Sequence, residues 1–129
     1  MSASGDTRPI HLDLWRIRLP IGGWVSILHR LSGVLLVVAI PAGAIVLGHA
    51  LSGPEGFAAS AALLGHPLVR LVVVVLVWGL LHHLAAGVRY LLLDLGLGLE
   101  RRSARRSAWL ALGAGLIATA LVLGVGVLA

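Results

Sequence analysis

The sequence predicts an all-α integral membrane protein whose three transmembrane helices run up, down and up. Of its 129 residues, 59% are apolar and only 12% are charged, whereas a soluble globular domain carries about 25% charged residues. Three apolar segments are each long enough to cross a bilayer, since about 30 Å of hydrocarbon takes about 20 helical residues. The arginines gather in the polar segments that flank these apolar ones. Together these observations exclude a soluble domain.

The elements follow in order along a single membrane domain, residues 1–129. A polar N-terminal segment, residues 1–21, is expected at the cytoplasmic surface, ahead of transmembrane helices at about 22–51, 69–94 and 107–128. The first loop begins with SGPEGF, which predicts a turn followed by a short interfacial helix before Pro67.

The third helix carries a small residue every four positions, at Ala111, Gly115 and Thr119. This spacing favours close contact between helices in lipid, where small side chains let two backbones approach. We therefore expect this stripe of the third helix to face another helix.

The charges orient the helices. The loop between the first two spans holds Glu55 and no arginine, while the other two polar segments hold Arg8, Arg16, Arg18, Arg101, Arg102, Arg105 and Arg106. By the positive-inside rule, the N-terminus and the second loop are cytoplasmic and the C-terminus is external, with Trp24 and Trp109 in the cytoplasmic aromatic belt. The arginines are thereby explained by topology, and we expect no nucleic-acid partner.

The compartment is indicated by the first residues and by cysteine usage. The N-terminal segment carries Asp6 and Asp13 ahead of any apolar run, and the chain has no cysteine. It is typical of neither a signal peptide nor an arginine-rich, acid-poor transit peptide. A bacterial inner membrane is therefore expected, and thiol or iron–sulfur ligation within this chain is excluded.

The first polar constellation lies at the cytoplasmic mouth of the first helix. Ser26, His29, Arg30 and Gly33 share one helix face, at positions i, i+3, i+4 and i+7. A serine can donate to a quinone oxygen, and an arginine can stabilise the negative charge that develops when that oxygen is reduced. The arginine can also pair with a carboxylate such as a haem propionate. The alternative is that Arg30 extends to lipid headgroups as a topology anchor.

The second constellation lies within the second helix. His83 is 11 residues from Asp94, which puts it roughly 16 Å from the helix end, near mid-membrane. Gly87, one turn away, is expected to leave room for a flat macrocycle, and histidine ligates haem iron in electron-transfer sites. An intramembrane ionisable residue is otherwise costly. The alternative is a buried histidine hydrogen-bonded to a neighbouring helix.

The adjacent His82 belongs to a different stripe, with Arg89, turned by about 100° from His83. The two histidines therefore cannot ligate one ion, and we expect His82 to form a helix–helix contact. A bis-histidine haem needs a second ligand. Among the other histidines, His29 is near the interface and His49 and His66 lie toward the opposite face. A partner chain or a symmetry copy is the better source.

These residues together resemble the cytochrome b membrane-anchor subunit of succinate dehydrogenase (complex II), over nearly the whole chain. The resemblance rests on Arg8-Pro9-Ile10, Leu14, Ile21, Ser26, His29-Arg30-Leu31-Ser32, His83-x3-Gly87-Val88-Arg89-Tyr90-Leu91 and Asp94-Leu95-Gly96. Tyr90 and Leu93 depart from the usual pattern of the family, which often has His or Phe at the first position and an aromatic residue or Met at the second.

The resemblance implies a haem b shared with a second membrane-anchor subunit. It also implies flavoprotein and iron–sulfur partner subunits on the cytoplasmic side, which pass electrons from succinate to a quinone. Carried over by residue, His83 is one axial ligand of the haem iron, Ser26 and Arg30 line the quinone site, and His29 and Arg30 lie near the haem propionates. The segment Arg8-Pro9 packs against the iron–sulfur subunit.

Two alternatives stay open at this point. An anchor subunit of a related fumarate reductase would carry the same residues, because the direction of the reaction depends on the quinone and on other subunits. In a non-redox transmembrane scaffold, the polar residues would serve packing and topology alone. Retention of haem separates the scaffold from the other two.

Overall fold

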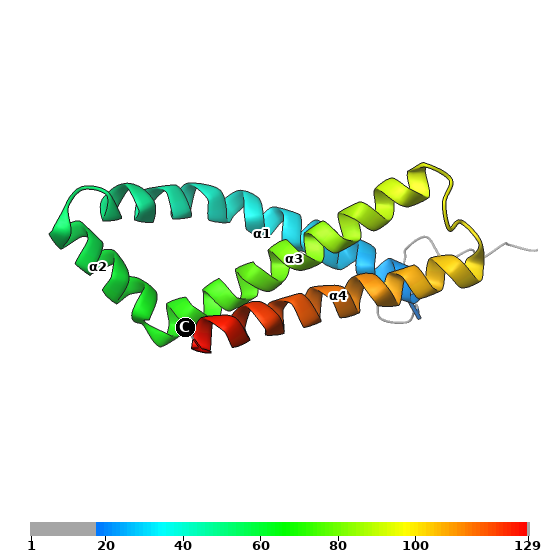
Figure 1. The fold of residues 1–129 in the computed structure, drawn as a ribbon. Coiled ribbons are helices and arrows are strands. Elements are labelled where there is room, and N and C mark those ends of the chain that lie inside the picture. The colour runs from blue at the N-terminus through cyan, green and yellow to red at the C-terminus, as the bar shows by residue number, and fades with distance from the viewer. Residues whose placement is uncertain (1–17, 129) are drawn as a thin grey trace, which may run out of the picture.

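The computed structural model describes residues 18–128, and it is helical almost throughout. Its elements are α1 (Ile21–Ala50), α2 (Pro54–Gly65), α3 (Pro67–Asp94) and α4 (Arg101–Leu128). The three long helices run alternately in opposite directions, with α3 packed against both α1 and α4, and the short α2 joins α1 to α3 at one end (Figure 1). The all-α prediction is confirmed.

Three helices are long and apolar enough to cross a membrane: Ile21–Ala50, Pro67–Asp94 and Arg101–Gly124. The helix α4 begins at Arg101, ahead of the apolar segment expected from residue 107. Arginine is a good helix former, so the helix continues through the polar arginine-rich residues beyond the apolar run.

The short helix after the first span is confirmed as α2, and glycines fix how it joins α1. Gly53 precedes α2 with φ +140°, a conformation that suits glycine, and Pro54 follows at the first helical position. Gly56 lies directly against the backbone carbonyl of His49, where any side chain would clash. The Ser60 hydroxyl donates to the Val46 carbonyl at 3.4 Å. The turn therefore folds α2 back onto the end of α1.

Small residues bring α3 and α4 together. Ala86 of α3 and Ala108 and Ala111 of α4 are buried, and a Cβ on Gly115 would lie 3.1 Å from the Cα and Cβ atoms of His82. Thr119 is also buried, and its hydroxyl donates to the Gly115 carbonyl at 2.7 Å. The expected contact of the small-residue stripe with another helix is thus confirmed, because bulkier residues would hold the backbones apart.

The helix α1 is much more open. Only Val25 and Ser32 are buried along its 30 residues, and large apolar side chains such as Val37 (69% exposed) and Ile40 (71% exposed) face outward. An apolar surface this extensive is stable when it faces lipid tails or another apolar protein surface.

Candidate functional site

The ring of His83 is held in place by the backbone of α1. Its Nδ1 lies 3.0 Å from the carbonyl oxygen of His29 and 3.2 Å from the hydroxyl oxygen of Ser32. Because a carbonyl oxygen can only accept, Nδ1 carries the proton and donates it, which leaves the lone pair of the neutral ring on Nε2. No hydrogen-bond partner contacts Nε2 among residues 18–128. This tautomer and orientation are the ones that a metal-ligating imidazole requires.

His29 supports the ring of His83 from the side. The two imidazoles are stacked, with centroids 4.0 Å apart and an interplanar angle of 11°, and Tyr90 meets His29 edge-on at 5.3 Å. Gly33 allows this approach, because a Cβ there would lie 3.1 Å from Cε1 of His83. A stacked neighbour covers a face of the ring and leaves the edge that carries Nε2 free.

The space beside Gly87 is used differently from the sequence-based expectation. A Cβ on Gly87 would lie 3.6 Å from Nε2 of His29, so in this structure the imidazole of His29 occupies the space beside the glycine where the sequence predicted room for a macrocycle.

The face shared by Ser26, His29, Arg30 and Gly33 is divided between two environments. His29 and Gly33 contact His83 of α3. Arg30 is exposed and Ser26 is half-buried, and neither makes a side-chain hydrogen bond within the described part of the chain. The two residues proposed for quinone therefore remain available to a ligand or a partner, about one helical turn apart.

The structure places His82 in the protein interior, as expected. It is fully buried, its ring is stacked on Trp78 with centroids 5.3 Å apart, and neither ring nitrogen has a hydrogen-bond partner within residues 18–128. Its backbone meets Gly115 of α4. His82 is thus the helix–helix contact that its stripe predicted.

Arg89, on the same stripe, bonds to α4. Its Nε donates to the Ser107 hydroxyl at 3.1 Å, and its Nη2 donates to the Ala104 carbonyl at 3.2 Å. Asp94, the acid near it in sequence, is exposed and makes no ion pair with it in the described structure. Within residues 18–128, Arg89 therefore bonds to two neutral acceptors.

Ser32 is the site residue whose role the sequence reasoning missed. It is buried, and its hydroxyl donates to the His29 carbonyl at 2.9 Å while lying within hydrogen-bond distance of His83. Its spacing of three residues from His29 permits that backbone bond, and serine often bonds back one helical turn. The segment Arg8-Pro9 lies outside the described residues.

The geometry around His83 fits an axial haem ligand. Residues 18–128 hold no cluster of three or more His, Cys, Asp or Glu side chains that could bind a metal ion. A haem iron needs only axial ligands from protein, since the porphyrin supplies the rest. His83 presents one ring nitrogen that has no hydrogen-bond partner within residues 18–128, with its tautomer fixed, which meets that need.

Comparison with known proteins shows the same family. The chain is 37% identical to the succinate dehydrogenase cytochrome b556 subunit of Coxiella burnetii over 90 residues, which is 69% of this chain and 72% of that protein. It is 34% identical to the succinate dehydrogenase cytochrome b556 subunit of Paracoccus denitrificans over 118 residues, covering 92% and 87% of the two chains. Residues 4–122 match the family described as succinate dehydrogenase/fumarate reductase transmembrane subunit, and the chain belongs to that family.

Proposed function

We propose that this chain, a cytochrome b556-type membrane-anchor subunit of succinate dehydrogenase, supplies one axial ligand of a haem b and part of a quinone-reduction site. The observation that carries the proposal is the fixed orientation of His83, whose Nδ1 donates to the His29 carbonyl at 3.0 Å. The hydrogen bond leaves Nε2 as the nitrogen that would ligate the iron.

A haem b bound here would accept and return one electron at a time, with a potential set by its ligands and surroundings. His83 would hold the iron through Nε2. The ring of His29 stacks on His83 at 4.0 Å, and the exposed Arg30 follows His29 on α1. We assign His29 and Arg30 to the haem propionates, because a guanidinium pairs well with a carboxylate.

Ser26 and Arg30 are assigned to the quinone. A serine hydroxyl donates a hydrogen bond to a quinone carbonyl, and a guanidinium stabilises negative charge on that oxygen during reduction. The exposure of Arg30 and the absence of a side-chain partner for Ser26 within the described residues support this assignment.

The open surface of α1 supports a second anchor subunit, which would complete the bundle and supply the second axial ligand. We infer that iron–sulfur and flavoprotein subunits bind at the arginine-rich end, on the cytoplasmic side of a bacterial inner membrane. The arginines at that end, with the positive-inside rule, support this orientation. Both relatives are named as subunits of succinate dehydrogenase, which favours succinate oxidation over the reverse reaction.

The test compares electron transfer to quinone with electron transfer to a soluble dye that accepts electrons before the membrane subunits. We expect Ser26→Ala and Arg30→Leu to lower succinate:quinone activity at least about tenfold, the loss typical when a charge-assisted bond to a developing anion is removed. Succinate:dye activity should stay unchanged. Arg70→Leu, an exposed arginine at the opposite end of α3, is the control. Full quinone reduction in both site variants contradicts the assignment.

A further inference from the structure

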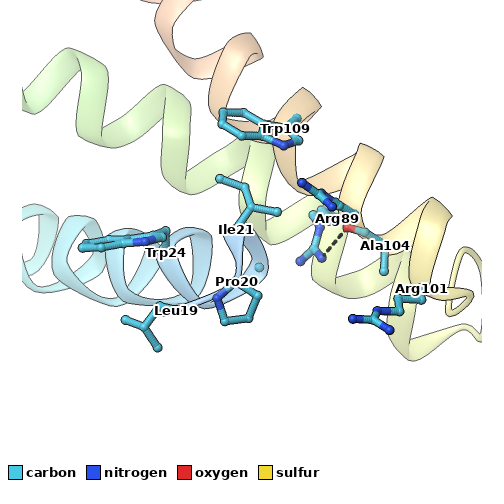
Figure 2. A pocket seen from close by; sticks show the side chains of 10 residues that line it. Leu19, Pro20, Ile21, Trp24, Arg89, Arg101, Ala104 and Trp109 are labelled. Atoms are coloured by element: carbon cyan, nitrogen blue, oxygen red, sulfur yellow. Dashed lines mark hydrogen bonds between the residues drawn. The ribbon is translucent and has the colours of Figure 1, made fainter. Parts of the chain in front are cut away.

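A cleft of about 650 Å³ opens where α1 and α4 begin, beside the last turns of α3. Figure 2 shows its wall of arginine and tryptophan side chains, with Trp24 on α1, Trp109 on α4 and Arg89 between the helices. Neither Ser26 nor Arg30 belongs to its lining, so the cleft is separate from the proposed quinone residues.

The cleft concentrates positive charge. Arg89, Arg101 and Arg105 line it, and among residues 18–128 no aspartate or glutamate does. Arg89 is only 9% exposed and bonds to two neutral oxygens, and its Nη1 has no hydrogen-bond partner within residues 18–128. The Tyr90 ring lies 5.3 Å from the guanidinium carbon. No carboxylate pairs with this charge among the described residues, so an anion in the cleft would stabilise it.

The backbone adds to the positive electrostatic potential in the cleft. The first turn of α1 lines the cleft at Ile21 and Gly22, and the helix has no side-chain cap at Pro20. The first residue of α4, Arg101, lines it too. Each helix start carries the positive end of a dipole and free N–H groups, a combination that binds phosphate. Two helix starts and three arginines therefore converge on one space.

The apolar residues in the wall of the cleft indicate that the anionic group belongs to an amphiphile. Trp24 and Trp109 are 51% and 58% exposed, and the apolar Leu19 and Ile21 complete this side. Tryptophan at a helix end is typical of the membrane interface, where an apolar ring meets the headgroups. A free phosphate would gain nothing from these rings, whereas an amphiphile would gain from both halves of the cleft.

We propose that this cleft binds the phosphate of an anionic phospholipid, with the guanidiniums on the headgroup and the tryptophans against the glycerol and upper acyl chain. Basic pockets between transmembrane helices bind lipid headgroups in this way. The site is independent of the haem and quinone assignments, and it makes a particular lipid a part of the assembled complex.

Native mass spectrometry of the purified complex tests the proposal after reconstitution in nanodiscs that contain phosphatidylglycerol in phosphatidylcholine. The variant Arg101→Gln/Arg105→Gln removes two cleft charges. The control Arg102→Gln/Arg106→Gln removes the same charge from exposed residues of the same turns that do not line the cleft. Size-exclusion chromatography checks that both complexes are assembled.

We expect the wild type and the control to retain phosphatidylglycerol and the cleft variant to lose at least about tenfold in retention, because charge-assisted hydrogen bonds are lost. Equal retention in the two double variants would overturn the proposal. A complex that retains no phosphatidylglycerol but binds added inorganic phosphate, with arginine dependence, would also overturn it in favour of a free-anion site. Absence of any bound phosphatidylglycerol in the wild type would overturn it as well.

Discussion

His82 and His83 are neighbours on α3, but they occupy opposite environments. His82 is fully buried with its backbone against Gly115 of α4, and neither ring nitrogen has a hydrogen-bond partner by distance and angle among the described residues. His83 is half-buried and faces α1, with Nδ1 held by two oxygens. The rotation of about 100° per residue produces this difference. Under the proposed assignment, the hydrogen bond that orients its ring suits His83 to be a ligand, whereas burial without such a bond leaves His82 as a packing residue.

The largest expected difference between the two histidines is the effect of replacing His82 by an apolar residue of similar size. Two buried nitrogens without partners each cost about 1–3 kcal/mol, so His82→Leu should be neutral or should stabilise the complex by an amount of that order. Thermal melting of the purified complex measures the change. His49→Leu, at an exposed histidine of α1, should leave the melting temperature unchanged. A large fall in the His82→Leu variant alone would show that the imidazole has a polar partner in the assembly.

A smaller effect, on the midpoint potential of the haem, is expected when the Ser32 hydroxyl beside His83 is removed. This prediction rests on the haem assignment of His83, since Ser32 lies 3.2 Å from Nδ1 of that residue. Hydrogen bonding at Nδ1 makes the imidazole a stronger donor to oxidised iron, so Ser32→Ala should raise the midpoint potential. The loss of about 1 kcal/mol, a typical hydrogen bond, corresponds to an upward shift of up to about 40 mV.

A redox titration of the haem band measures this shift. Ser60→Ala provides the matched control, because it also removes a serine bond to a helix carbonyl, but on α2. Its potential should equal that of the wild type. An unchanged or lowered midpoint potential in Ser32→Ala would show that the Ser32 hydroxyl does not strengthen His83 as a ligand.

The sequence predicted the parts of the fold that depend on composition and helical period. The apolar runs gave the three spans, and the 3.6-residue period separated the stripe of His82 and Arg89 from that of His83. The small-residue spacing predicted that the stripe with Gly115 faces another helix, and the structure shows that it meets α3 at His82. Each of these properties is local to one helix, which is why a pattern can show it.

The details that depend on how two helices are rotated against each other could not be predicted from the sequence. The stacking of His29 on His83, the filling of the space at Gly87 and the hydrogen bond from Ser32 all arise from the contact of α1 with α3. The start of α4 at Arg101 was missed because a hydropathy pattern ends where the apolar run ends, while the helix continues into polar surroundings.

The most direct test of the central claim is the reduced-minus-oxidised optical spectrum of the purified complex, recorded for wild type, His83→Ala and His82→Leu. Removal of His83 deletes an axial ligand, so the account predicts a b-type band in the wild type and in His82→Leu and its loss in His83→Ala, with membrane insertion retained. A band that survives in His83→Ala, or one that disappears only in His82→Leu, would contradict the account.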